Sequence, residues 1–467
     1  MIFSQVYVYL TQFLTLLLTE MFKFFSFTRH KVSEEIEVPC STDQDVKMEE
    51  PIRPELNFIS NMPLNIIDNI LRRLTLRQVV RTSILSREWR YKWLTCPELK
   101  FNIWYDRTFL RSHKLEKIIY QILRLHQGPL LKFVIQVPDL KSNPNIDQWV
   151  HMLPDTLQHL ALHVSIGDKH KLTSRVCNLR NLRKLRLYNI AFDHPPGFMG
   201  FPKLVYLDLH NSGLVPENFG TFIALCPLVE KLTMIHCTAF DCLEIIGPKL
   251  KFFEFHGIFK TVSFKNCPVL TDLRLTFSYP AFKAENGFSF DLVKSLSCLP
   301  ALDELQLQAY ALEDLVEYGA PDKLPIALKT LKYLHLTDMY FEKTAETSCA
   351  ICFIRSCTNL QRLKITAFTF EVVDSVADFL RAQTPTRSLT QLKAVKMQLF
   401  CGIESEMEFV RYILASATVL EKMAITPHPG TIDDGGESIV NELKQYPRAS
   451  PKVEIISSDQ KHDTFMV

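Results

Sequence analysis

From about residue 150 onward, apolar residues recur in the pattern L-x-x-L-x-L, in which leucine is sometimes replaced by another apolar residue. Alternation over the last positions of each copy predicts a short strand with one apolar face. A single copy cannot bury that face alone, so neighbouring copies must stack on each other. The copies begin at Leu157, Leu182, Leu204, Val229, Leu250, Leu270, Leu302, Leu331, Leu360, Leu392 and Leu420.

Successive copies are spaced by about 20 to about 32 residues, which is centred on the range of leucine-rich repeats. Several copies are introduced by a cysteine in the same register, at Cys226, Cys267 and Cys357. Free cysteine packs as a small hydrophobic residue, so we expect these thiols to be buried and structural. The pattern predicts a leucine-rich-repeat solenoid with a curved parallel sheet over residues 150–388.

Polar side chains stand between the inward leucines of each predicted strand. Because successive side chains of a strand point to opposite faces, these residues should face the concave surface of the solenoid. This surface is mixed in charge and partly aromatic, which suits recognition of a protein. The candidate substrate-binding residues are Lys184, Arg186, Tyr188, Tyr206, Asp208, His210, Arg274, Gln306, Tyr333, His335, Arg362 and Lys364. The alternative is that most of them are merely solvated.

Residues 389–455 keep two strand-like copies and insert "SEMEFVRYILASATVL" between them. Ser405 and Glu408 have the spacing of a capping box, in which the serine caps the helix and the glutamate reaches back to it. We therefore expect a helix that starts after Ser405 and a modified terminal unit that closes the array. Residues 456–467 form a short tail.

Residues 57–100 have a different, helical pattern. Asn61 can cap a first helix that has Pro63 in its first turn and ends near Leu74. A second short helix fits 77–85, and Ser86 opens a third that carries Trp89 and Trp93 on one side. Three helices of this length form only a marginal core. Their remaining apolar surface should therefore meet the rest of the chain or another protein.

The flanks of this helical segment are less informative. Met1 to Thr19 is uncharged and approaches the length of a membrane span, but it lacks the basic start and cleavage site of a signal peptide. Residues 1–28 are thus either an anchor or a dispensable extension, and we do not expect a membrane partner. Residues 29–56 are polar, acidic and proline-containing, typical of a disordered linker. Residues 101–149 connect the helices to the solenoid.

Charge and cysteine content limit the partners and the cellular compartment that we expect. The net charge of +2 gives no overall attraction to nucleic acid or to a membrane. Lysine and arginine outnumber acidic residues between Phe58 and Lys100, which raises a nucleic-acid alternative. These arginines are interleaved with an apolar stripe, however, so we expect no nucleic-acid partner. The twelve cysteines are scattered and no Asn-x-Ser/Thr sequence is present, so we expect a location in the cytoplasm or nucleus.

No catalytic motif was found: the sequence lacks a phosphate-binding glycine loop, H-E-x-x-H and G-x-S-x-G. Cys349 and Cys352 have the spacing of half a zinc site, but no second C-x-x-C follows at the distance of a zinc finger. The alternative, which we prefer, is that they pack inside an apolar helix. We predict that the protein is not an enzyme and needs neither a metal nor a cofactor.

The stretch "FISNMPLNIIDNILRRLTLRQVVRTSILSREWRYKWL" closely resembles an F-box, and "LKAVKM" with "EMEFVRYILASATVLEKMAI" resembles the FBD region. Together with the repeats, residues 57 to about 455 resemble the plant F-box proteins that have leucine-rich repeats and a C-terminal FBD region. The resemblance implies a substrate-recruiting subunit of an SCF-type ubiquitin ligase. Its F-box would bind a Skp-type linker protein, which joins it to a cullin.

Carried over by position, the resemblance implies a set of linker-binding residues. Arg81, Arg87 and Arg90 would face the acidic linker. Two positions depart from the family pattern, because Leu64 replaces an acidic residue and Thr75-Leu76 replaces the second Leu-Pro. The implied linker-binding residues are Ile59, Met62, Pro63, Ile66, Ile67, Ile70, Leu71, Leu74, Val79, Leu85, Trp89 and Trp93.

Two alternatives compete with the adaptor. The chain could be a leucine-rich-repeat scaffold that binds a partner without a ligase, or the F-box-like helices could pack only on the repeats. If the adaptor hypothesis is right, Trp89→Ala or Ile70→Ala should abolish co-purification with the linker, since a few anchors dominate such interfaces.

Overall fold

The computed structural model describes residues 63–74, 76–85, 89–102, 112–137, 140–214, 216–277, 292–309, 324, 328–368, 374–385, 389–429 and 436–458. The chain divides into two units, and all of these residues belong to the second, Ile59–Val467. The expectations for residues 1–28 and 29–56 lie outside the described residues, as does most of the tail. Among the helices described, none is long and apolar enough to cross a membrane.

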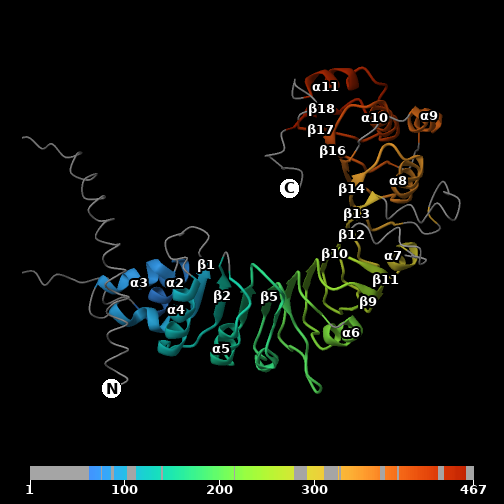
Figure 1. Cartoon of the computed structure of the whole chain (residues 1–467). Helices are drawn as coiled ribbons and strands as arrows, with labels where there is room; N and C mark the ends of the chain where they lie inside the picture. The colour runs from blue at the N-terminus through green and yellow to red at the C-terminus, as the bar shows by residue number, and fades with distance from the viewer. Residues whose placement is uncertain are drawn as a thin grey trace, which may run out of the picture. The chain divides into compact units, whose positions relative to one another are not determined.

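A parallel sheet of 14 strands runs through the second unit, in the order β1-β2-β3-β5-β7-β8-β10-β12-β13-β14-β15-β16-β17-β18 (Figure 1). The predicted parallel solenoid is confirmed. Its strands are β1 (Glu98–Asn102), β2 (Lys132–Gln136), β3 (His159–His163), β5 (Lys184–Tyr188), β7 (Tyr206–His210), β8 (Lys231–Ile235), β10 (Phe252–Gly257), β12 (Asp272–Phe277), β13 (Glu304–Gln308), β14 (Tyr333–Met339), β15 (Arg362–Ala367), β16 (Ala394–Phe400), β17 (Lys422–Pro427) and β18 (Glu454–Ser457).

The sheet starts earlier than the repeat pattern predicts. β1 and β2 precede residue 150 and pair with each other and with β3 in the same parallel register. Phe133 and Ile135 take the two inward positions that leucines hold in later copies, and both are buried. The segment 101–149 therefore adds strands to the array as well as connecting it to the helices.

Buried side chains from successive strands form a continuous column on the inward face. In β5 the side chains alternate between exposed and buried, with Leu185 and Leu187 inward. Burial of one such side chain stabilises the fold by about 1.5–3 kcal/mol. The column, fully buried and in register, contains Leu160, Leu185, Leu207, Leu232, Phe253, Leu273, Leu305, Leu334, Leu363, Val395 and Met423.

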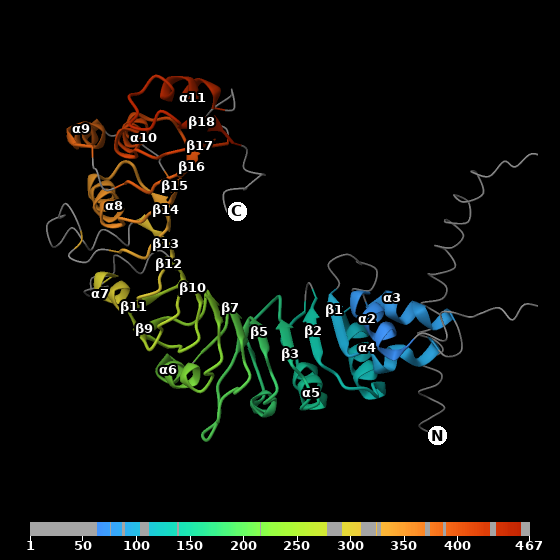
Figure 2. The same cartoon turned by 180° about the vertical axis from the view of Figure 1, so that it is seen from behind.

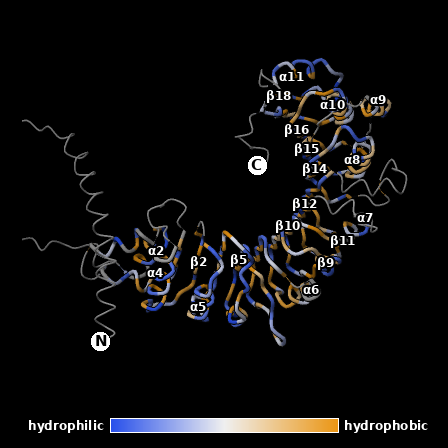
Figure 3. Tube along the Cα trace, in the orientation of Figure 1, coloured by the Kyte–Doolittle hydropathy of each residue, from blue (hydrophilic) through white to orange (hydrophobic). Residues whose placement is uncertain are grey.

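Helices and two small sheets cover the face of the sheet that carries the buried column, which is the convex side of the curved sheet (Figures 1 and 2). Apolar residues gather between these layers, and α8 and α10 are apolar over most of their length (Figure 3). The helices are α4 (Ser112–Leu125), α5 (Pro144–Met152), α6 (Pro216–Ala224), α7 (Leu292–Ser297), α8 (Thr344–Ser356), α9 (Asp374–Ala382), α10 (Glu404–Ser416) and α11 (Glu437–Leu443), with the 3-10 helix η4 (Ser174–Asn178). The small sheets pair β4 (His170–Lys171) with β6 (Ile190–Ala191), and β9 (Phe240–Ile246) with β11 (Phe259–Lys265).

The residue after a strand often adopts a left-handed conformation that turns the chain. Asn189 follows β5 with φ 56° and Asn211 follows β7 with φ 47°. Asparagine tolerates this region better than most residues. The Asn211 side-chain amide donates to Asn189 Oδ1 at 2.9 Å, so the two turns are also linked to each other.

The predicted capping box of α10 is wrong. The helix begins at Glu404, and its N-cap, Ile403, makes no side-chain capping bond, so Ser405 lies inside the first turn. Glu406 provides the capping instead: its Oε2 accepts from the backbone N–H groups of Cys401 and Gly402, both at 2.8 Å. Glu346, at the same place in α8, accepts from the Tyr340 N–H at 3.0 Å. A glutamate in the third helical position thus caps both α8 and α10.

The N-terminal helices, called here the helical bundle (residues 63–97), contain α2 (Leu64–Arg73), α3 (Leu76–Arg81) and the 3-10 helices η1 (Thr82–Ile84) and η2 (Trp89–Thr95). The N-cap of α2 is Pro63, so the prediction that Asn61 caps this helix is wrong. The second predicted helix is split into α3 and η1, and the third is a 3-10 helix. Lys100 Nζ on β1 donates to the Arg72 carbonyl at 3.1 Å, so the bundle contacts the first strand.

Candidate functional site: two interaction surfaces

The helical bundle divides its predicted linker-binding residues between core and surface. Five of them face inward and are buried: Ile67, Leu71, Val79, Trp89 and Trp93. Trp89 is only 2% exposed, so it supports the bundle from inside.

The other described members of this set lie at the surface. Ile66 is 42% exposed and Leu85 is 52% exposed, while Ile70 and Leu74 are half-buried and Pro63 is exposed. Ile59 and Met62 lie outside the described residues.

The helical period explains this division. Residues four apart lie nearly above one another on a helix, so Ile67 and Leu71 of α2 point inward together. Ile66 and Ile70 form the neighbouring row, at the edge of the same apolar stripe, and are less buried. Tyr91 on η2 is 63% exposed and is not among the predicted linker-binding residues. Its signal was available, since it stands two residues after inward-facing Trp89. Arg81 is half-buried, whereas Arg87 and the side chain of Arg90 lie outside what the structure describes.

The second surface is the open face of the sheet, opposite the buried column. All twelve predicted substrate-binding residues lie on it, because each alternates with an inward residue of its strand. Their exposure differs. Lys184, Arg186 and Tyr188 are exposed; Tyr206, His210, Arg274, Gln306 and Arg362 are half-buried; and Asp208, Tyr333, His335 and Lys364 are buried.

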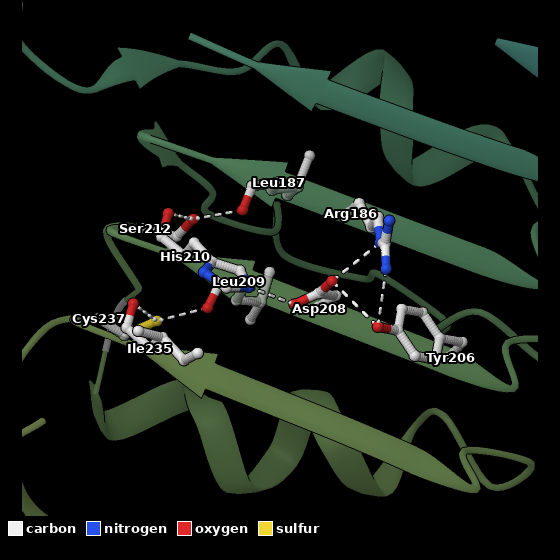
Figure 4. Close-up of polar contacts among 9 residues, drawn as sticks. All are labelled: Arg186, Leu187, Tyr206, Asp208, Leu209, His210, Ser212, Ile235 and Cys237. Atoms are coloured by element: carbon white, nitrogen blue, oxygen red, sulfur yellow. Dashed lines mark hydrogen bonds and ion pairs between the residues drawn. The ribbon is translucent and has the colours of Figure 1, made fainter. Parts of the chain in front are cut away.

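Asp208 is the centre of a polar network on this face (Figure 4). Its Oδ2 is 2.9 Å from Arg186 Nε and accepts from the Tyr206 hydroxyl at 3.1 Å, and its Oδ1 is 2.7 Å from His210 Nε2. Burial of Asp208 opposes its ionisation, but the hydrogen bond and charge of His210 and the charge of Arg186 outweigh burial and lower the pKa of the carboxyl. Because Arg186, Tyr206 and His210 all contact this carboxylate, the network holds these side chains in place.

Cations stack on aromatic rings beside this network. Lys231 Nζ lies 4.0 Å from the ring centroid of Phe252 and 5.8 Å from that of Tyr206. Arg274, on β12 at the other side of β10, lies 4.9 Å from the Phe252 centroid. Such contacts stabilise by about 0.5–1 kcal/mol at exposed sites and hold long cationic side chains in place.

Further along the sheet, polar and charged side chains of the open face contact one another. His335 Nε2 is 3.0 Å from Thr366 Oγ1, and Gln308 donates to Asp338 at 2.7 Å. Arg362 lies 4.8 Å from the Tyr333 centroid and 3.2 Å from Glu304. This part of the face is therefore tied into its own contacts.

Seven of the eleven described cysteines are buried. Cys226, Cys267 and Cys357 are buried, as predicted, and burial raises the pKa of Cys226 to about 11. Cys349 and Cys352 are both buried in α8. Within the described ranges, no group of three or more His, Cys, Asp or Glu residues could hold a metal ion.

Comparison with known proteins finds three family models along the chain. The F-box domain matches residues 59–101, the LRR repeats of FBD-associated F-box protein At5g56370 match 146–365, and the FBD matches 383–425. A leucine-rich-repeat protein of Leptospira interrogans, LIC12759, is a distant structural neighbour with a TM-score of 0.34 and 16% identity over 79% of this chain and 91% of that chain.

Three Arabidopsis thaliana proteins are similar over nearly their whole length. The F-box/FBD/LRR-repeat protein At1g13570 is 31% identical over 86% of this chain and 98% of its own. F-box/LRR-repeat protein 13 is 23% identical over 86% of this chain and 96% of its own. The F-box/FBD/LRR-repeat protein At3g26920 is 23% identical over 85% of this chain and 95% of its own.

Proposed function

Because this chain belongs to the F-box/FBD/LRR-repeat family, we propose that it is the substrate-recognition adaptor of an SCF-type ubiquitin ligase. Proteins of this kind are generally non-catalytic substrate adaptors of such ligases, and an F-box generally binds a Skp-type linker. In this proposal the helical bundle binds the linker and, through it, a cullin. The open face of the sheet binds a protein substrate.

The observation that carries the proposal is the exposed apolar surface of the bundle. The bundle already contacts β1, yet Ile66, Leu85 and Tyr91 remain exposed to solvent. Removing apolar surface from water stabilises a complex, and a few central anchors usually supply most of the binding energy. A second polypeptide that covers these side chains is the partner this surface fits, and this favours the adaptor over a bundle that packs only on its own repeats.

The adaptor needs no nucleophile. It would hold a lysine of the substrate near a charged conjugating enzyme and so raise its effective concentration. We also propose that the complex acts in the cytoplasm or nucleus, because the eleven described cysteines are free thiols, as a reducing compartment requires.

Co-purification from plant cells with the Skp-type linker and cullin tests the proposal. Leu85→Asp and Ile66→Asp should each lower linker recovery by about tenfold or more, since a charge would be buried in the interface. Met199→Asp is the matched control, because Met199 is 70% exposed and lies in the repeats. Recovery of other partners without linker and cullin would instead support the scaffold alternative.

Trp89→Ala is not a suitable test, which corrects the expectation from the sequence. Removing a buried tryptophan costs about 3–5 kcal/mol, enough to unfold the bundle. Loss of linker binding in this variant would then report on folding rather than on the interface. Ile70 is half-buried, so Ile70→Ala remains a usable surface variant.

A further inference from the structure

One row of side chains on the open face alternates between cations and rings. The first outward position of six consecutive strands, from β2 to β10, is in register across the sheet. Cations stand on β2, β5 and β8, and rings stand on β3, β7 and β10. In order, this cation–ring row is Lys132, His159, Lys184, Tyr206, Lys231 and Phe252.

Positive charge in this row is only partly neutralised. Lys184 is exposed, and no carboxylate pairs with it among the described residues. Lys231 is held by its two rings. Lys132 is 3.8 Å from Glu98, but that carboxylate is closer to Lys100, at 2.7 Å.

The lysines of this row also act on the pKa of His159. Burial, followed by the charges of Lys132, Lys184 and Arg186, lowers the pKa of His159 to about 4. The ring is therefore neutral at pH 7.

Most of the nearby carboxylates are already engaged. Asp208 is bound by Arg186 and His210. At the two ends of the row, Asp272 is bound by Arg274 and Glu98 by Lys100. The row therefore offers cations toward solvent without matching anions of its own.

The spacing of the cations matches an extended peptide. Neighbouring strands lie about 4.8 Å apart, so cations on every second strand are about 10 Å apart. A polyproline-type chain rises about 3.1 Å per residue with three residues per turn, so every third side chain points to the same side, about 9 Å from the last. A chain that crosses the strands along this row can thus place one side chain on each cation.

We propose that the cation–ring row binds an extended acidic segment of the substrate, with carboxylates at every third position. These carboxylates meet Lys132, Lys184 and Lys231, and apolar side chains from intervening positions rest on His159, Tyr206 and Phe252. The inference rests on the proposed function, since the segment is taken to belong to the ubiquitination substrate. A single-stranded nucleic acid also pairs cations with rings, and the peptide and oligonucleotide probes below distinguish the two ligands.

Fluorescence anisotropy with the full chain bound to its linker tests this site. The probe is a labelled peptide of about ten residues with glutamate at its first, fourth and seventh positions. The control peptide has the same composition with its three glutamates adjacent. The spaced peptide should bind about tenfold more tightly than the control, and about 0.5 M NaCl should weaken its binding.

Charge reversal locates the site. Lys184→Glu with Lys231→Glu should lower affinity for the spaced peptide by about tenfold or more, and Lys184→Glu alone by about threefold or more. Lys171→Glu with Lys249→Glu is the matched control: both lysines are exposed and lie off the row, on β4 and in the turn before β10. Because Lys184 is exposed, its single variant separates lost binding from lost folding.

Equal binding of the two peptides, unchanged affinity in the Lys184 and Lys231 variants, or tighter binding of a uridine oligonucleotide would each overturn the proposal. These failures are distinguishable from failure of the adaptor role. The Lys184 and Lys231 variants should still co-purify with the linker. The Leu85→Asp chain, tested without linker, should still bind the spaced peptide.

Discussion

Replacing Asp208 by asparagine tests whether the polar network on the open face stabilises the sheet. The carboxylate is 6% exposed and has three partners, two of which, Arg186 and His210, carry or can carry positive charge. Asparagine keeps the size but loses the charge, and its amide group points donors at groups that are themselves donors. The change is therefore local and electrostatic.

The magnitude follows from burial and exposure together. A hydrogen bond to a charged group contributes about 1.5–3 kcal/mol when both partners are buried. Here the side chain of Arg186 is 54% exposed and that of His210 is 34% exposed, so water can replace Asp208 for both. We therefore expect Asp208→Asn to lower the free energy of unfolding by about 2 kcal/mol in total, because solvent screening reduces each of the two contacts below the value for a buried pair.

The assay is urea unfolding combined with hydrogen exchange, because a repeat array opens locally as well as globally. Faster exchange should be confined to β5, β7 and β8. Thr233→Val, at the neighbouring register position on β8, is the control and should change stability by less than about 0.5 kcal/mol.

The pH dependence gives a second, independent reading. The folded pKa of Asp208 is lowered, so its contribution to stability is complete above the unfolded pKa of about 3.9 and is lost as pH falls through the folded pKa. The difference between wild type and Asp208→Asn should shrink as the pH falls below about 4. Equal stability of the two proteins at pH 7, or a difference that does not shrink in acid, would refute the reasoning.

Two further predictions concern the core and the thiols. Leu305→Ala should lower the free energy of unfolding by about 2–5 kcal/mol. Leu305 is fully buried in the column, and its neighbours on β12 and β14 cannot collapse onto the cavity. A loss below about 1 kcal/mol in urea unfolding would contradict this packing. Maleimide should label exposed Cys242 and Cys298 in the native protein but reach Cys226 and Cys357 only after unfolding, since burial raises the pKa of both buried thiols. Mass spectrometry of the labelled peptides checks this, and equally fast labelling of Cys226 and Cys298 would be evidence against it.

The sequence by itself determined the backbone architecture. The L-x-x-L-x-L period contains both the strand alternation and the inward face, so the parallel sheet, the buried column and the buried repeat cysteines could be predicted. The alternation likewise placed all twelve candidate residues on the open face. These features depend on the spacing of neighbouring residues, which a sequence shows directly.

Only the tertiary structure decided which side chains meet. Lys184, Tyr206 and Lys231 come from separate repeats, and their alternation depends on a register between strands that no single repeat contains. For the same reason β2 was not predicted, because Phe133 and Ile135 stand where later repeats have leucines. The sequence also did not show that Trp89 is buried in the bundle while Leu85 is exposed at its surface. Whether a residue is buried depends on the segment that packs against it. In this chain that segment is often distant in the sequence, and the local pattern does not specify its position.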